Sequence, residues 1–151
     1  MEAIMEKITE EIIRIVPENF RENSIIIENF TKKELPDAEM NSLMAQVEKM
    51  IGQEFYYLYI SKKNGIIIGV ISFFILFDST VSIIKGVEEH WLVSKEYRNS
   101  RLAFKLFKKY MDTCKEFNVE RVYISSYTKK LDKFYEKKGF ICKSKLYVKE
   151  F

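Results

Sequence analysis

The chain has 151 residues, of which 31% are charged and 47% hydrophobic, with a net charge of +3. This length predicts one domain over residues 1–151 with a sizeable core, and the composition excludes a disordered chain. Cys114 and Cys142 form no metal-binding or disulfide pattern, so a cytoplasmic protein is expected and no metal is predicted. The most apolar run, residues 66–77, is too short to span a bilayer, and no secretory signal is visible, so no membrane is expected.

The charge is divided unevenly along the chain. Up to His90 there are nine Lys and Arg against fifteen Asp and Glu, or −6, whereas from Trp91 onward there are sixteen against seven, or +9, which sum to +3. A basic half suits a polyanion, either nucleic acid or a phosphate-rich cofactor, and an acidic half suits a cationic molecule. Solvated faces of helices would produce the same counts.

The first half of the chain predicts helices. Residues 2–16 carry isoleucines at helical spacing, and Pro17 then interrupts the helix or starts a new turn. Residues 20–27 fit more than one structure. A second helix is entered at residues 35–37, carries apolar side chains at helical spacing up to Ile51, and stops at Gly52.

A β-hairpin follows. Residues 55–61 and 66–77 are rich in strand-forming side chains, and Asn64 with Gly65 between them is a strong hairpin signal, because both residues tolerate positive φ. After a polar break at residues 78–80, residues 81–84 lead into or join a strand over residues 87–93.

This strand leads through a polar loop at residues 94–100 into an amphipathic helix that runs to Phe117. Ser100 stands where an N-cap is expected. The unpaired N–H groups at such a helix start attract phosphate, and Arg98 and Arg101 add positive charge. An ordinary connection with solvated arginines fits the same pattern. A strand at residues 121–127, a short helix at 129–138 closed by Gly139 and a strand at 146–151 complete the prediction.

The sequence VSKEYRNSRLA of residues 93–103 resembles motif A of the GNAT family of N-acetyltransferases. In that motif a strand ending in Val and a short turn precede Arg or Gln, two residues, Gly, one residue, and Gly or Ala. Arg98 and Ala103 match its ends, whereas Arg101 stands where the family usually has glycine and Lys95 where it often has proline. The missing glycine would weaken cofactor binding, or Arg101 would add a phosphate contact.

A second segment supports the resemblance. Residues 134–140, FYEKKGF, are similar to the family's F-Y-E-x-x-G-F motif, whose tyrosine commonly lies near the sulfur of coenzyme A. The two motifs occur in the family's order, and the resemblance extends from about Phe55 to the C-terminus.

The resemblance implies a mixed α/β (α+β) fold, in which a central, mostly antiparallel sheet is flanked by helices and two helices before the hairpin border the acceptor site. It implies an enzyme that transfers an acetyl group from acetyl-CoA directly to an amine, of a small molecule or a protein. A homodimer is left open. Two other functions are also left open: an inactive acyl-CoA-binding module of the same fold, suggested by Arg101, and a small basic nucleic-acid-binding domain, which the sequence favours least.

Attack of an amine on a thioester requires a neutral nitrogen, so a base must accept a proton. We expect Glu89 to be this base and keep Glu88 second. Strand alternation puts Glu89 on one face with Trp91, and Glu88 on the other face with His90. A bulge, which is common in this strand of the family, would invert this assignment.

The resemblance also implies the remaining site residues. Tyr135 is the expected general acid, which would protonate the leaving sulfur. The backbone of Leu92 and Val93 would pair with the pantetheine arm like an added strand. Ser126, with Ser125, stands where the family usually has asparagine. The cofactor's pyrophosphate would be bound by a loop of six residues: Arg98, Asn99, Ser100, Arg101, Leu102 and Ala103.

Overall fold

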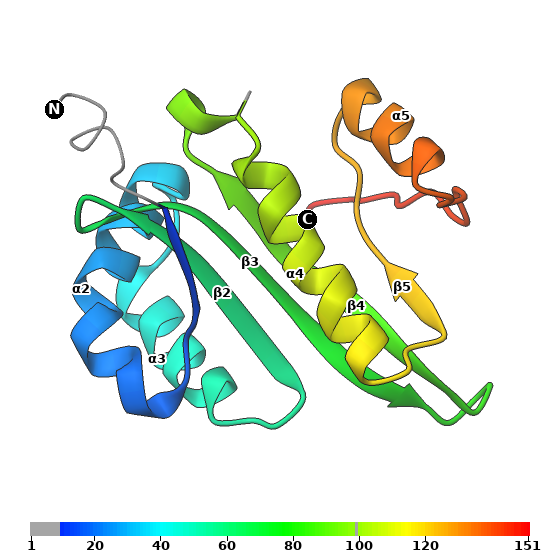
Figure 1. Ribbon diagram of the computed structural model, residues 1–151, viewed down its shortest axis with the longest axis horizontal. Coiled ribbons are helices and arrows are strands. Elements are labelled where there is room, and N and C mark those ends of the chain that lie inside the picture. The colour runs from blue at the N-terminus through cyan, green and yellow to red at the C-terminus, as the bar shows by residue number, and fades with distance from the viewer. Residues whose placement is uncertain (1–9, 99) are drawn as a thin grey trace, which may run out of the picture.

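The computed structural model describes residues 10–98 and 100–151. Its centre is a five-stranded sheet in the order β1-β2-β3-β4-β5, with helices on both faces (Figure 1). Neighbouring strands are antiparallel, except that β4 and β5 run parallel. The expected mixed, mostly antiparallel sheet flanked by helices is therefore confirmed. No helix in the described part of the chain has the length and apolar character needed to cross a membrane.

The first described element is a strand, β1 (Glu11–Arg14), which pairs with β2. The helix predicted at residues 2–16 is therefore wrong where it can be compared, and residues 1–9 lie outside the described residues. Ile13 packs on one face of the sheet and Ile12 on the other. Side chains that alternate between two buried faces, with β-branched residues throughout, favour a strand over an amphipathic helix.

Two helices follow before the hairpin. Helix α2 (Pro17–Glu34) begins at Pro17, and the side chain of Asn19 closes its start by accepting a hydrogen bond of 2.8 Å from the N–H of Val16. It includes residues 20–27, which the sequence left open. Helix α3 (Met40–Ile51) is capped by Glu39, whose carboxylate accepts from the N–H of Ser42, and it ends at Gly52 as predicted.

The hairpin forms as predicted from β2 (Tyr56–Lys63) and β3 (Ile66–Asp78). Asn64 and Gly65 between the strands both have positive φ, of 54° and 76°. Strand β4 (Ile83–Val93) begins four residues before the predicted start at residue 87. Of the segment 81–84, residues 83 and 84 therefore join the strand.

The second half of the chain crosses to the other face of the sheet. After a 3₁₀ turn, η1 (Lys95–Tyr97), come α4 (Leu102–Glu116), β5 (Arg121–Tyr123) and α5 (Lys129–Lys137). The strand predicted at residues 121–127 thus ends at Tyr123. The strand predicted at 146–151 is wrong: these residues form no strand and are exposed. The segment contains the strand-forming residues Tyr147, Val148 and Phe151, but it pairs with none of the five described strands.

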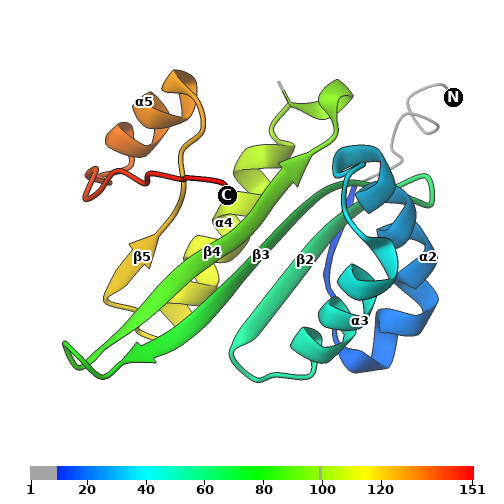
Figure 2. The ribbon, with the colours of Figure 1, turned by 180° about the vertical axis from the view of Figure 1, so that it is seen from behind.

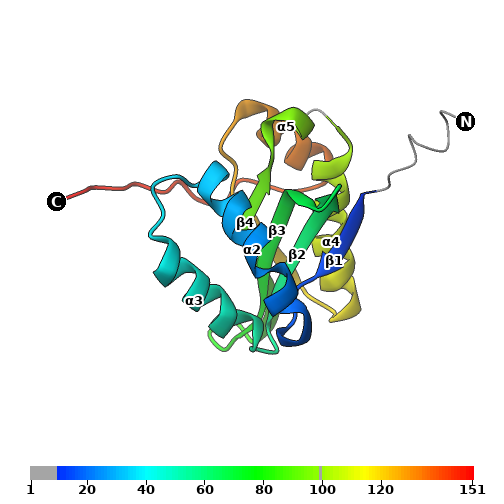
Figure 3. The ribbon, with the colours of Figure 1, turned by 90° about the vertical axis from the view of Figure 1, so that its left-hand side faces the viewer.

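The sheet separates two hydrophobic cores (Figures 2 and 3). One lies between the sheet and the pair α2 and α3, and the other lies between the sheet and α4. Gly86 in β4 brings α4 close to the sheet, because a Cβ built on Gly86 would stand 2.9 Å from the sulfur of Cys114 and 3.1 Å from the ring of Tyr110.

We predict that Gly86→Ala destabilises the protein by about 1–3 kcal/mol, the usual cost of overpacking a tightly filled core. Urea unfolding measures this free energy. Gly52→Ala is the matched control, since the nearest atom to its Cβ is 3.5 Å away and its backbone is helical. A loss at Gly86 no larger than at Gly52 would mean that α4 packs less closely on β4 than described.

Candidate functional site

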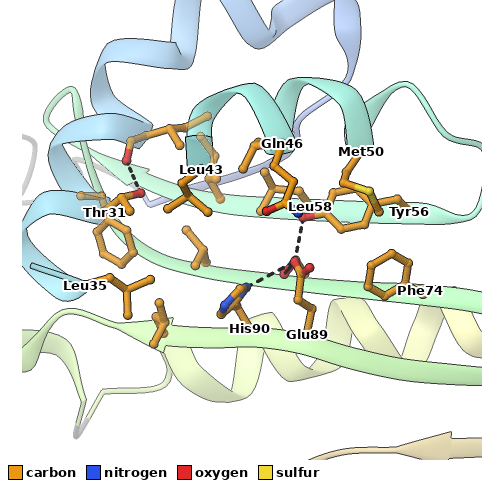
Figure 4. Close-up of a pocket in the computed structure, with 17 residues that line it drawn as sticks. Thr31, Leu35, Leu43, Gln46, Met50, Tyr56, Leu58, Phe74, Glu89 and His90 are labelled. Atoms are coloured by element: carbon orange, nitrogen blue, oxygen red, sulfur yellow. Dashed lines mark hydrogen bonds and ion pairs between the residues drawn. The ribbon is translucent and has the colours of Figure 1, made fainter. Parts of the chain in front are cut away.

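A pocket with a volume of about 300 Å³ lies between the helices α2 and α3 and the sheet face formed by β2, β3 and β4 (Figure 4). Most of its lining is apolar. Its polar side chains include Tyr56, Ser72, Glu89 and His90. The two helices that border it precede the hairpin, as the sequence resemblance implied.

A β-bulge in β4 determines which side chains face this pocket. Ser72 of β3 lies opposite His90, and Phe73 lies opposite Glu88, so Glu89 is an extra residue without a cross-strand partner. Such a bulge lets two consecutive residues point to the same side of a sheet. Glu89 and His90 accordingly both line the pocket (Figure 4).

The faces predicted from simple alternation are therefore wrong, and the bulge is the reason. Glu89 lies on the same face as His90 rather than with Trp91. Glu88 lies opposite Phe73, whose side chain belongs to the core under α4, so Glu88 occupies the far face. Of the two carboxylates proposed from the sequence, only Glu89 lines the pocket.

Three donors hold one oxygen of Glu89. Its Oε1 accepts a hydrogen bond of 2.9 Å from Ser72 and one of 3.1 Å from Tyr56, and it lies 3.3 Å from Nδ1 of His90. Burial acts to raise the pKa of Glu89, but the contacts from His90 and Ser72 outweigh it and hold that pKa below its usual value. Glu89 is therefore an anion at neutral pH, and its side chain is 33% exposed to an incoming cation.

The pKa of His90 is shifted in the opposite direction to that of Glu89. The hydrogen bond to Glu89 raises the pKa of His90 above its ordinary value, in spite of partial burial. Its side chain is 45% exposed. A histidine in this position exchanges protons with solvent near neutral pH, so the pair has the chemistry to accept a proton from a bound group and release it.

On the far face of the sheet, Glu88 and Tyr135 interact electrostatically. Burial raises the pKa of Glu88. Burial and then the charge of Glu88 raise the pKa of Tyr135, which stays a neutral phenol at physiological pH. The hydroxyl of Tyr135 donates a hydrogen bond of 3.0 Å to the carbonyl of Ser125. To protonate another group, it would have to leave this carbonyl.

The loop after β4 is folded onto the start of α4. The hydroxyl of Ser100 accepts a hydrogen bond of 3.2 Å from the N–H of Leu102, although Arg101 rather than Ser100 occupies the N-cap position. The first backward bond of the helix joins the N–H of Lys105 to the carbonyl of Arg101. The N–H groups of Ala103 and Phe104 lie in the first turn of the helix, and neither donates a backbone hydrogen bond to a described residue. Such N–H groups at a helix start attract an anion.

Arg98 joins this loop to the pocket side of the molecule. Its Nε donates 3.0 Å to the carbonyl of Val93, and its guanidinium lies 3.5 Å from the carboxylate of Glu34 at the end of α2. Beside this pair, Lys33 lies 3.4 Å from Glu96. Arg98 thus has a structural role that the sequence motif did not reveal.

Strands β4 and β5 separate toward the loop. They pair only between residues 85–87 and 121–123, and beyond them β4 runs away from the chain that follows β5 (Figure 2). The N–H of Ser94 donates a hydrogen bond to the carbonyl of Ile68 in β3. Because the backbone groups of every second residue face the same neighbour in an antiparallel pair, those of Leu92 also face β3. Those of Trp91 and Val93 face the open side. The backbone groups of Leu92 are thus directed toward β3 rather than toward the open side, and the pairing of Val93 with a pantetheine arm stays a prediction.

Other predicted residues contribute less to this arrangement. Ser126 bonds the carbonyl of Thr128 and the carboxylate of Asp132, which occupies its hydroxyl at the start of α5. Asn99 lies outside the described residues. Across residues 10–98 and 100–151, no three His, Cys, Asp or Glu side chains are grouped to hold a metal ion.

The sequence analysis missed Tyr56 and Ser72, which position Glu89. Ser72 had a detectable signal, because it is a lone hydroxyl in the apolar run of residues 66–77 and is 1% exposed. A buried polar side chain in a strand requires a partner. Tyr56 gave no such signal, since its neighbours are also aromatic.

The model of the acetyltransferase (GNAT) family matches residues 21–140. No curated protein sequence matches the chain. Solved structures share its fold at 14–18% identity. An acetyltransferase of Trypanosoma brucei is 18% identical with a TM-score of 0.72, and the match covers 95% of this chain and 100% of that one.

Two further structures are similar over nearly their whole length. The ribosomal-protein-alanine N-acetyltransferase from Brucella melitensis biovar Abortus 2308 is 16% identical, with a TM-score of 0.66 and coverage of 95% of this chain and 99% of the other. The aminoglycoside N-acetyltransferase AAC(6')-Iy, in complex with CoA, is 14% identical, with a TM-score of 0.75 and coverage of 95% of both chains.

We predict that Glu89→Gln lowers the pKa of His90 toward about 6.5, because it removes the anion that stabilises the protonated imidazole. The chain has one histidine, so an NMR titration reports this group without assignment. In the unchanged protein the pair stabilises the fold below about pH 6.5 and loses this contribution as the pH rises through the raised pKa of His90. Glu120→Gln is the control, because Glu120 is exposed and lies just before β5, beside Ile84 at the far end of β4 from His90. An unchanged His90 pKa in Glu89→Gln would contradict the pair.

Proposed function

Because the chain belongs to the acetyltransferase (GNAT) family, we propose that it transfers the acetyl group of acetyl-CoA directly to an amine. The observation that carries this proposal is the placement of an anionic Glu89, in contact with His90, in a pocket that adjoins the open side of β4. This arrangement provides an amine site on one side of the strand and room for a thioester at its edge.

The residues around the loop fit coenzyme A. The N–H groups in the first turn of α4, with the positive charge of Arg101, suit its pyrophosphate. The backbone groups of Trp91 and the N–H of Val93 suit the amides of its pantetheine arm, which would add to the sheet like a short strand. When bound, acetyl-CoA supplies an activated carbonyl carbon and a thiolate leaving group.

The chain's own residues would manage the protons. An alkyl amine is mostly protonated at neutral pH, so Glu89 would first attract it as an ammonium ion. Glu89 and His90 would then take a proton from the nitrogen and release it to solvent. The nitrogen forms the new C–N bond as the C–S bond breaks, and it would lose its second proton to solvent through the same pair. The departing sulfur takes a proton, for which Tyr135 is the proposed donor, and solvent would return a proton to the phenolate.

The experiment that tests the proposal combines thermal unfolding with an assay for free coenzyme A thiol. At about 100 times its dissociation constant, acetyl-CoA should raise the unfolding midpoint by roughly 5–10 °C, and adenosine should not. Amines should then release free thiol. A midpoint shift without release from any amine would instead support an inactive acyl-CoA-binding module, and no shift would contradict both.

We predict that Arg101→Glu weakens acetyl-CoA binding by about tenfold or more, since it places a negative charge beside the proposed pyrophosphate position. Titration calorimetry measures the affinity. Arg121→Glu makes the same charge change on β5 and should leave the affinity within about twofold. Equal effects of the two variants would remove the loop from the proposed cofactor site.

We predict that Tyr135→Phe lowers kcat by about 100-fold or more, the usual contribution of a positioned proton donor, without a comparable change in KM for acetyl-CoA. Tyr127→Phe is the control, because that ring is 79% exposed. Circular dichroism of both variants separates loss of activity from loss of fold. An unchanged kcat would assign protonation of the sulfur to solvent.

A further inference from the structure

The pocket has a chemical character that restricts its occupant. Eleven of its seventeen lining residues are Ile, Leu, Val, Met or Phe, and they come from α2, α3 and all three strands. These apolar residues are Ile27, Phe30, Leu35, Leu43, Val47, Met50, Leu58, Ile60, Val70, Phe74 and Leu92. Among the residues that the structure describes, Glu89 is the one carboxylate in the lining.

The negative charge of the pocket is concentrated on Glu89. Tyr56, Ser72 and His90 all bond Oε1 of Glu89, and no hydrogen bond from the described residues reaches Oε2. Glu34, the carboxylate at the end of α2, pairs with Arg98 and does not line the pocket. The site thus offers one anionic position, beside an apolar wall.

From this charge pattern we propose, resting on the function proposed above, that the acceptor is a small primary monoamine with an apolar body. Its nitrogen would lie at Glu89 and His90, and its hydrocarbon part would lie between the sheet and the helices α2 and α3. Burial of that part against Leu, Val and Phe side chains would supply most of the affinity.

A molecule with several ammonium groups does not fit this lining. Its second charge would lie among apolar side chains without a partner, and desolvating an unpaired charge is costly. The cavity volume is about 300 Å³. This value lies at the lower end of the volumes that are typical of ligand pockets. This acceptor class therefore differs from the aminoglycosides named for one of the structures with the same fold.

The first experiment measures kcat/KM of the whole protein with acetyl-CoA and two amines of equal length, hexylamine and 1,6-diaminohexane. The monoamine should be preferred at least tenfold. Along the series from propylamine to hexylamine, kcat/KM should rise by up to about fourfold for each added methylene, the gain expected from its burial. A diamine preference, or a flat series, would overturn the monoamine assignment.

A second experiment alters the pocket charge. Gln46 lies on the α3 side of the pocket (Figure 4), and Gln46→Glu adds a carboxylate there with almost no change in shape. The variant should raise the kcat/KM ratio of diamine to monoamine by at least fivefold. Gln53→Glu makes the same change outside the lining and should leave the ratio unaltered. Equal ratios in the two variants would overturn the assignment.

The outcomes separate this inference from the function on which it rests. Turnover of spermidine, an aminoglycoside or a peptide N-terminus in preference to hexylamine would overturn the monoamine assignment and leave the acetyltransferase function intact. No release of thiol with any of these amines would overturn both. Preference for hexylamine over all three supports the inference.

Discussion

One extra residue in β4 determines where the charge of the pocket lies. Without the bulge at Glu89, alternation would send Glu89 and His90 to opposite faces, and the two groups could not tune each other's pKa. With the bulge, both side chains line the same pocket, and the pKa of Glu89 is lowered there. Glu88 lies on the far face, where burial raises its pKa. The two carboxylates adjoin in sequence but have opposite pKa shifts in different environments, which is how neighbouring acids acquire separate roles.

Contacts between helix α2 and the loop after β4 join the pocket to the start of α4. Arg98 bonds both the carbonyl of Val93 and the carboxylate of Glu34, so the end of α2 is attached to the loop that precedes α4. Leu102 packs on Gly69 of β3, where the absence of a side chain lets the first turn of α4 approach the sheet. Side-chain contacts at both ends of one loop therefore connect the end of α2, which borders the pocket, to the first turn of α4.

Much of the fold could be predicted from local signals, because those signals have local causes. Asn64 and Gly65 specify the hairpin through positive φ, and Gly52 ends α3. The errors arose where structure depends on a distant partner. Residues 11–14 become a strand by pairing with β2, whereas residues 146–151 contain strand-forming residues but pair with none of the described strands. In the site, the residue types were found, but the face of Glu89 could not be read from β4 alone, since a bulge is a property of two paired strands.

The same distinction applies to the acceptor. The fold is shared with proteins of 14–16% identity that are named for a ribosomal protein and for aminoglycosides. The fold alone therefore does not select among acceptors. Selection depends on side chains that the backbone arrangement does not determine. A pocket that binds a polycation needs several carboxylates, each with its own stabilising donors, because an unsupported buried charge is costly. In this chain the stabilising donors Tyr56, Ser72 and His90 all converge on one carboxylate. The number of supported charges, rather than the size or shape of the fold, is therefore the feature that distinguishes a monoamine site from a polyamine site.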